Sequence, residues 1–157
     1  MTKALTGGCQ CGAVRYRFRA LGRASICHCR MCQKAMGNYF APLVEVEGFE
    51  WTRGERGLFA SSNLSNRGFC RSCGTPLTLE TDAIVEVAIG SLDDPAIVPI
   101  EYHANIADRH DIVMHLDTVP EADPAVGAEN DAWNARIVSH QHPDHDTALW
   151  PPGHADG

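Results

Sequence analysis

The sequence predicts a mainly β domain organised around zinc, and three observations lead to this prediction. Short segments rich in β-branched and aromatic residues follow one another at close spacing, with Gly and Pro between them. No long amphipathic helical pattern occurs before Pro120. Seven cysteines fall into three tight groups with the spacing of metal ligands. A chain of 157 residues is long enough for one such domain but too short for two domains that each have a sizeable core.

The expected elements follow the chain in order. Residues 12–18 alternate between apolar and other side chains, which is typical of a half-buried strand, and residues 25–27 predict a short strand. Residues 30–36 predict one or two helical turns that end at Gly37. Further strands are expected at residues 39–46, 49–52, 58–61, 66–69, 75–81, 83–89, 100–104 and 112–115.

The end of the chain differs in character from the rest. Residues 121–157 hold Pro, Asp and His and few apolar side chains, so they have little capacity to build a core. We therefore expect a zinc-binding β domain over residues 1–120. Residues 121–157 are expected to form an acidic, Pro/His-rich and irregular C-terminal extension laid on that domain.

Charge and hydropathy exclude several classes of protein. The chain has 13 basic and 20 acidic side chains and a net charge of −7, which disfavours nucleic acid as a partner because phosphate binding needs clustered positive charge. No apolar run is long enough to span a membrane, and no secretory signal is visible, so a cytoplasmic location is expected. Arg15, Arg17 and Arg30 belong to a basic stretch that predicts either a solvated face or a rim for an anionic small molecule.

The seven cysteines divide naturally as four plus three. Four thiolates complete a closed tetrahedral zinc site, whereas three leave the open position that a catalytic zinc needs. The odd count disfavours disulfides, and the Gly-Thr-Pro turn after Cys70 and Cys73 disfavours a thioredoxin-like redox pair. The count alone therefore suggests one structural zinc and one catalytic zinc.

Two of the three groups can form a site that joins distant parts of the chain. Cys70-x-x-Cys73 followed by glycine is typical of a zinc knuckle, in which a tight turn directs two sulfurs at one point. Cys9-x-Cys11 can supply the two remaining ligands if the N-terminal segment lies beside that turn. Such a site would contribute on the order of 10 kcal/mol of apparent folding free energy.

The remaining group can form a site within a single loop. Cys27-x-Cys29-x-x-Cys32 can place three sulfurs on one metal and leaves no cysteine for the fourth position. Spacing alone leaves open an alternative in which Cys27 and Cys29 pair with the knuckle at Cys70. His28 lies between two ligands, and we expect it to lie beside the metal rather than to bind it.

Three motifs together resemble one protein family. They are GGCQCGAVRY at residues 7–16, CHCRMCQK at 27–34 and RGFCRSCGTPL at 67–77. In order and approximate spacing, residues 5–120 resemble the glutathione-dependent formaldehyde-activating enzyme family, which includes centromere protein V-like proteins. The resemblance implies a β-tent fold of antiparallel strands around zinc. It also implies a structural zinc on Cys9, Cys11, Cys70 and Cys73 and a catalytic zinc on Cys27, Cys29 and Cys32.

The family activity is the joining of glutathione and formaldehyde into S-hydroxymethylglutathione, which is classed as a carbon–sulfur lyase by its reverse direction. Three thiolates carry −3 against the +2 of zinc, which favours a soft thiol over water as the fourth ligand. Arg15, Arg17 and Arg30 are the candidate partners for the glutathione carboxylates. No general base stands out, and His103 and His110 are candidates only by their place in the chain. The alternative function is a non-catalytic, zinc-stabilised binding module.

A histidine-rich segment near the end of the chain resembles a different metal motif. His140-x-His142-x-Asp144-His145 is similar to the metal-binding motif of the metallo-β-lactamase fold. That fold needs further ligands far downstream, and only 12 residues follow His145. We therefore expect adventitious metal binding or a solvated polar turn here.

Overall fold

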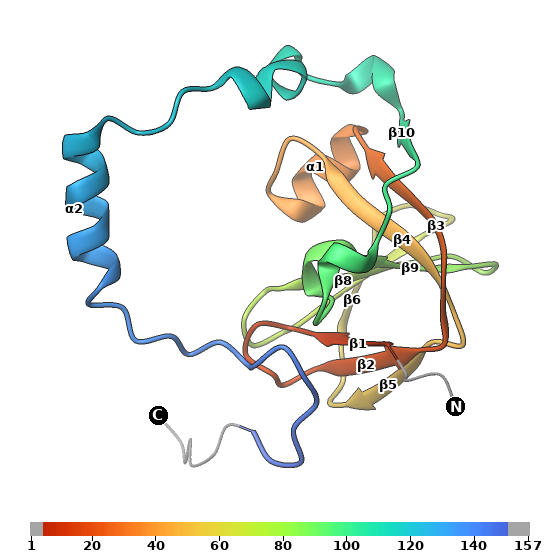
Figure 1. The fold of residues 1–157 in the computed structure, drawn as a ribbon. Helices are drawn as coiled ribbons and strands as arrows, with labels where there is room; N and C mark the ends of the chain where they lie inside the picture. Colours follow the sequence, from red (N-terminus) through yellow and green to blue (C-terminus); the bar gives the residue numbers. More distant parts are fainter. Residues whose placement is uncertain (1–4, 151–157) are drawn as a thin grey trace. The chain divides into compact units, whose positions relative to one another are not determined.

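The computed structural model describes residues 5–150, and the predicted mainly β fold is confirmed (Figure 1). The strands of this part of the chain are β1 (Leu5–Gly8), β2 (Arg15–Phe18), β3 (Ala20–Cys27), β4 (Ala41–Glu47), β5 (Glu50–Arg53), β6 (Gly57–Ala60), β7 (Asn66–Phe69), β8 (Pro76–Glu80), β9 (Val85–Ala88) and β10 (Tyr102–Ala104). Its helices are α1 (Arg30–Met36) and α2 (Pro124–Asn134) and the 3-10 helices η1 (Ile89–Ser91), η2 (Pro95–Ile97), η3 (Ile106–Asp108) and η4 (Asp111–Thr118).

The strands form two sheets. The smaller sheet has the order β1-β2-β5, and the larger has the order β10-β3-β4-β9-β8-β7-β6. Neighbouring strands pair antiparallel throughout, except that β10 pairs parallel with β3 at one edge of the larger sheet. That pairing brings residues 102–104 beside residues 25–27, at the entrance to the three-cysteine group.

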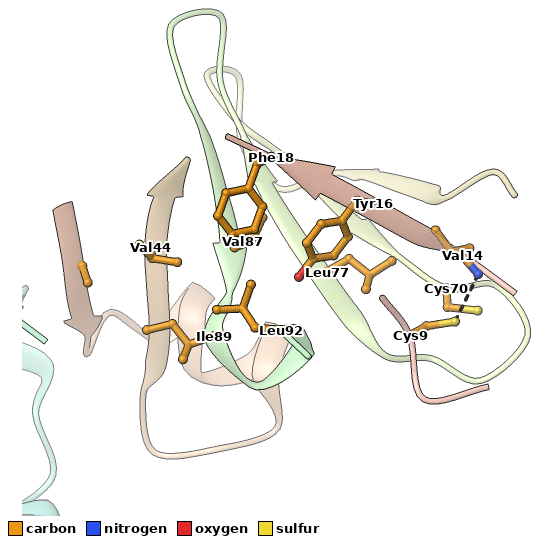
Figure 2. Packing of buried hydrophobic residues seen from close by; sticks show 11 residues of the cluster. Cys9, Val14, Tyr16, Phe18, Val44, Cys70, Leu77, Val87, Ile89 and Leu92 are labelled. Atoms are coloured by element: carbon orange, nitrogen blue, oxygen red, sulfur yellow. Dashed lines mark hydrogen bonds between the residues drawn. The ribbon is translucent and has the colours of Figure 1, made fainter. Parts of the chain in front are cut away.

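The main core lies between the smaller sheet and one face of the larger sheet (Figure 2). Tyr16 and Phe18 extend from β2, and they are 0% and 1% exposed. Val44 of β4 and Val87 of β9 meet them from the larger sheet. Burying each such side chain contributes about 1.5–3 kcal/mol, so β2 is fixed against the larger sheet by its apolar face.

The hydroxyl of Tyr16 ties this core to the turn after β9. Its Oη lies 2.7 Å from Ser91 Oγ, and Ser91 Oγ itself donates to the main-chain oxygen of Ala88 at 2.7 Å. The Ser91 proton is therefore used, and Tyr16 must donate to Ser91. A side chain at Gly7 would clash, because its Cβ would lie 2.5 Å from the Tyr16 hydroxyl. Glycine at this position lets β1 approach β2 over the buried ring.

The larger sheet has a second cluster on its other face. Successive residues of a strand point to opposite faces, so Leu43 lies on the face opposite Val44. Leu43 packs with Cys27, Cys32 and Ala41 in a cluster separate from the main core. The register carries this second face across the sheet through Glu45, Glu86, Leu79, Arg67 and Phe59, which are paired in turn.

The described chain divides into two compact units. One runs to Arg109 and takes in the segment that begins at Gln141, and the other is His110–His140. The boundary at residue 120 between two domains stays a prediction. Among the described residues, no helix is long and apolar enough to cross a membrane.

The second unit differs from the sequence prediction in two places. The strand predicted at residues 112–115 is wrong, because these residues lie in the 3-10 helix η4. A strand needs a neighbour for its main-chain hydrogen bonds, whereas a 3-10 turn makes its own, as Val113 does with His110 at 3.1 Å. The expected irregular extension contains α2, whose first turn is capped by the Asp123 carboxylate, which accepts from Ala125 N at 2.9 Å.

Candidate metal centres

Four cysteines from two distant loops converge in the first unit. Cys9 and Cys11 lie between β1 and β2, and Cys70 and Cys73 lie between β7 and β8. Their four Sγ atoms lie within 4.8 Å of one another. All seven cysteines of the chain are free thiols in the structure, so no disulfide competes for these sulfurs.

Similar turns present the two pairs. Gly12 N donates to Cys9 O at 3.0 Å, and Gly74 N donates to Cys70 O at 2.9 Å. Both glycines have a left-handed φ, +74° and +78°, which other residues adopt only with strain. The turns direct the sulfurs inward, where Val14 N donates to Cys9 Sγ at 3.3 Å (Figure 2).

The chemistry of these four thiols fits zinc. Burial raises the pKa of the Cys9 thiol, and it raises the pKa of Cys11 to about 12. At Cys73, burial is outweighed by hydrogen bonds from Thr75 and Cys11, which lower its pKa to about 6. Cys9 and Cys11 in contrast ionise only when a cation compensates their charge, and four thiolates are the donor set of a closed tetrahedral zinc site. The four-cysteine group can thus hold a structural metal that joins the loop after β1 to the loop after β7.

Three cysteines form a second group around the start of α1. Cys27 ends β3, Cys29 is the N-cap residue of α1, and Cys32 lies in the first turn of the helix. Their Sγ atoms lie within 4.8 Å of one another. The helix ends at Gly37, which has a left-handed φ of +61°. The alternative pairing of Cys27 and Cys29 with the knuckle at Cys70 is not what the structure shows.

Each sulfur of the three-cysteine group accepts a hydrogen bond. Asn105 Nδ2 donates to Cys27 Sγ at 3.2 Å, and Cys32 N donates to Cys29 Sγ at 3.4 Å. Arg67 Nη2 donates to Cys32 Sγ at 3.3 Å. A hydrogen bond from Cys32, opposed by burial and aided by Asn105, lowers the pKa of Cys27 to about 5. The same contact, together with burial, raises the pKa of Cys32, so Cys27 and Cys32 hold one proton between them until a cation takes its place. The group therefore fits a cation that lets all three sulfurs bind as thiolates.

Two of these donors, Arg67 and Asn105, are candidate site residues that the sequence motifs do not reveal. Arg67 opens the third motif, but nothing in its spacing indicates a contact with Cys32. Asn105 has a left-handed φ of +53°, the one non-glycine residue of the described chain with positive φ. Strained backbone of this kind clusters at functional sites, and here it lies beside the Cys27 sulfur.

His28 lies beside the second group without belonging to it. The side chain is 0% exposed, and its Nε2 lies 2.9 Å from His103 Nδ1. Burial lowers the pKa of His28, and the charges of His103 and Arg109 lower it further. Gln33 Nε2 donates to the main-chain oxygen of His28 at 2.7 Å and so ties α1 to this loop.

Comparison with known proteins identifies the family of this chain. A family model described as glutathione-dependent formaldehyde-activating enzyme matches residues 4–108. The chain belongs to the glutathione-dependent formaldehyde-activating enzyme family. The matched region contains all seven cysteines.

Among solved structures, the chain is similar to a Rhodobacter sphaeroides protein known from its crystal structure. The two share 21% sequence identity with a TM-score of 0.49, and the match covers 63% of this chain and 99% of the other.

In this member of the glutathione-dependent formaldehyde-activating enzyme family, the three candidate carboxylate-binding arginines lie in different environments. Arg15 is 3% exposed, and Asp93 and Asp146 hold its guanidinium, so it is no part of a solvated rim. Arg17 is exposed on the smaller sheet and pairs with Glu50 at 2.7 Å. Arg30 begins α1, beside the three-cysteine group, and its Nη1 donates to Gln33 Oε1 at 3.2 Å.

The other histidines of interest also lie in different parts of the structure. His103 lies against His28, whereas His110 begins the second unit. His142 is buried, and its Nε2 lies 3.0 Å from Thr147 Oγ1. Within residues 5–150, neither potential metal-binding group includes a histidine of the metallo-β-lactamase-like segment.

Proposed function

We propose that the chain is a zinc-dependent carbon–sulfur lyase that acts on the adduct of glutathione, or a related thiol, with an aldehyde. S-hydroxymethylglutathione is such an adduct. The observation that supports this function is the three-cysteine group, in which every sulfur accepts at least one hydrogen bond and the donor to Cys32 is the cationic guanidinium of Arg67. At the four-cysteine group the contacts are with neutral groups: Val14 N donates to Cys9 Sγ, and Thr75 Oγ1 lies 3.1 Å from Cys73 Sγ.

The reaction is an addition and its reverse. In the synthetic direction the thiol sulfur forms a bond to the carbonyl carbon, and the proton lost by sulfur ends on the former carbonyl oxygen. Nothing is oxidised or reduced. When bound at three thiolates, zinc supplies an exchangeable fourth position and lowers the pKa of a thiol held there.

The chain's own residues set the charge of that position. Three thiolates alone would make the group electron-rich and poorly receptive to another anionic sulfur. The guanidinium of Arg67 at Cys32 and the amide of Asn105 at Cys27 withdraw part of that charge through hydrogen bonds. The backbone N–H at Cys29 does the same from the first turn of α1.

Recognition of glutathione requires a partner for its carboxylates. Arg30 lies three residues after Cys27 and two before Cys32, and its side chain is exposed. The contact with Gln33 holds the guanidinium on the helix surface. Because Arg15 and Arg17 are paired elsewhere, we assign the carboxylate contact to Arg30.

The proposal is tested by the rate at which carbon exchanges between formaldehyde and its glutathione adduct, since the uncatalysed addition is reversible. Zinc-loaded protein should accelerate exchange of ¹³C-labelled formaldehyde in an NMR exchange experiment. Cys29→Ser should abolish the acceleration while the fold, followed by circular dichroism, persists. If two-zinc protein leaves the exchange rate unchanged, the non-catalytic binding module becomes the better description.

A further inference from the structure

A small apolar cavity lies next to the three-cysteine group. It has a volume of about 170 Å³ and lies between α1 and the strands β6, β7 and β8. Phe59 on its wall is 62% exposed, so the cavity is reached from solvent. Its apolar wall residues are Ala35, Met36, Phe59, Phe69 and Pro76.

Arg67 connects this cavity to the cysteines. It lines the cavity, and its Nη2 donates to Cys32 Sγ at 3.3 Å. From the other wall, Met36 packs against the cluster that contains Cys27 and Cys32. An occupant of the cavity therefore lies one side chain away from the candidate catalytic group.

The guanidinium of Arg67 has one nitrogen without a partner. The residue is 9% exposed, Nε donates to Ser61 Oγ at 3.0 Å, and Nη2 is held by Cys32. Nη1 is buried and has no hydrogen-bond partner. Leaving a buried donor of a charged group without a partner costs free energy. We therefore expect Arg67 Nη1 to donate a hydrogen bond to an acceptor on a ligand.

Size and charge define the ligand. An apolar cavity of about 150 Å³ is large enough for benzene, so the present one takes a group of about six carbon atoms. The thiolates already place negative charge beside Arg67, and Glu86 interacts with Cys27 and Arg67. A carboxylate bound at Nη1 would be repelled by this negative charge, whereas a neutral carbonyl oxygen would not.

We propose that this cavity is a subsite for the substituent of an aldehyde larger than formaldehyde, whose carbonyl oxygen accepts a hydrogen bond from Arg67 Nη1. The inference rests on the proposed lyase function and narrows its carbonyl substrate to aldehydes with an apolar group of up to about six carbons. The bond changes are those of the same addition: sulfur bonds to the carbonyl carbon, and the thiol proton ends on the carbonyl oxygen. Arg67 acts here as a specificity residue that positions this oxygen.

The first test of the cavity measures the binding of compounds that do not react. Benzamide carries a neutral carbonyl and a six-carbon ring and does not react with thiols, and acetamide has the same carbonyl without the ring. By ligand-observed NMR titration of zinc-loaded protein, benzamide should bind at least about tenfold more tightly than acetamide, because only the ring fills the cavity.

Two variants with the same substitution localise the binding. Ala35→Phe fills the cavity from α1 and should weaken benzamide binding at least about tenfold. Ala60→Phe adds the same ring at an exposed position of β6 outside the cavity and should leave binding unchanged. Arg67→Lys keeps the charge but loses the planar fork, and it should weaken benzamide and acetamide by similar factors. Equal benzamide binding by Ala35→Phe and wild type would overturn the subsite.

The exchange assay then separates the two proposals. The rate with butanal, relative to the rate with formaldehyde, should fall at least about tenfold in Ala35→Phe and stay constant in Ala60→Phe. Acceleration with formaldehyde together with no benzamide binding would refute the subsite and keep the lyase. Benzamide binding that Ala35→Phe removes, with no acceleration for any aldehyde, would refute the lyase and keep the cavity as a ligand site.

Discussion

The indole nitrogen of Trp150 donates a hydrogen bond of 2.9 Å to the main-chain oxygen of Cys11, 139 residues earlier in the chain. His142 N donates to the oxygen of Gln10 at 2.7 Å, and the rings of His142 and Trp150 meet edge to face. A Cβ on Gly12 would lie 2.3 Å from each ring. The C-terminal segment, residues 141–150, therefore covers the turn that presents two sulfurs of the four-cysteine group.

Loosening this cover should release metal from one site only. Trp150→Phe keeps a ring but removes a hydrogen bond of about 1 kcal/mol, so transfer of zinc from the four-cysteine group to a chelator should become about fivefold faster. Trp133→Phe is the matched control, since Trp133 is 65% exposed in the second unit. Equal zinc release by the two variants would show that the C-terminal segment does not protect the site.

The two cysteine groups should differ in what their loss does to the fold. Cys70→Ser removes a ligand from a site that joins segments about 60 residues apart, and metal binding free energy there is folding free energy. We expect this variant to unfold at a much lower temperature than wild type, and chelator to add little further effect. Thermal unfolding with and without chelator measures both.

Cys29→Ser should behave differently, because its group closes within residues 27–32. The fold should persist while zinc content, measured by mass spectrometry or a colorimetric assay, falls from two per chain toward one. A Cys29→Ser variant that unfolds as readily as Cys70→Ser would contradict the assignment of a structural and a catalytic site.

Arg15 offers a direct comparison of a buried with an exposed ion pair. Asp93 accepts two hydrogen bonds from its guanidinium, at 2.8 and 2.5 Å, and is 12% exposed, whereas Asp146 is 52% exposed. Asp93→Asn should lower the free energy of unfolding by about 3 kcal/mol and Asp146→Asn by less than about 1 kcal/mol. Urea denaturation of both variants at pH 7 decides this, and equal losses would refute it.

The same pair predicts the direction of a pH dependence. Burial raises the pKa of Asp93, but hydrogen bonds from Arg15 and Thr6 outweigh burial, and the net pKa is lowered from 3.8. Because the pKa of Asp93 is lower in the folded than in the unfolded protein, ionised Asp93 stabilises the fold fully above pH 3.8. This stabilisation is lost as the pH falls through the pKa that Asp93 has in the folded protein. The difference in stability between wild type and Asp93→Asn should therefore stay constant from pH 7 down to pH 5.

Asn105 should tune the affinity of the three-cysteine group for zinc. Asn105→Gly tolerates the left-handed backbone and removes only the amide at Cys27, so zinc affinity should fall about tenfold. Asn105→Asp also suits this backbone but places a carboxylate beside thiolates, and it should weaken zinc further. Competition with a chelating dye gives both affinities, and unchanged values would exclude a role for the amide.

Arg30 should select an anionic thiol. Arg30→Ala should weaken glutathione binding about ten- to a hundredfold, and binding of a small neutral thiol much less, because a charge-assisted hydrogen bond is lost. Arg17→Ala is the control, since Arg17 lies on the smaller sheet and pairs there with Glu50. Calorimetric titration of both thiols distinguishes a carboxylate contact from a solvated side chain, for which the two thiols would weaken equally.

The mainly β class and the grouping of the cysteines follow from the sequence alone. Alternation and turn residues act within a few positions of the chain, and so do the C-x-C and C-x-x-C turns with their glycines. For the same reason α1 was predictable over residues 30–36, with its end at Gly37. The spacing of the seven cysteines is enough, without tertiary information, to identify them as candidate metal ligands.

The residues that surround those thiols are evident only from the three-dimensional arrangement of the chain. Arg15 alternates with Tyr16 along β2, yet it is buried because Asp93 and the C-terminal segment cover it. Asn105 and Arg67 reach the sulfurs through strand pairings that join residues 78 and 35 positions apart. Contacts at such separations depend on sheet order and register, which local patterns leave undetermined because many pairings satisfy the same alternation.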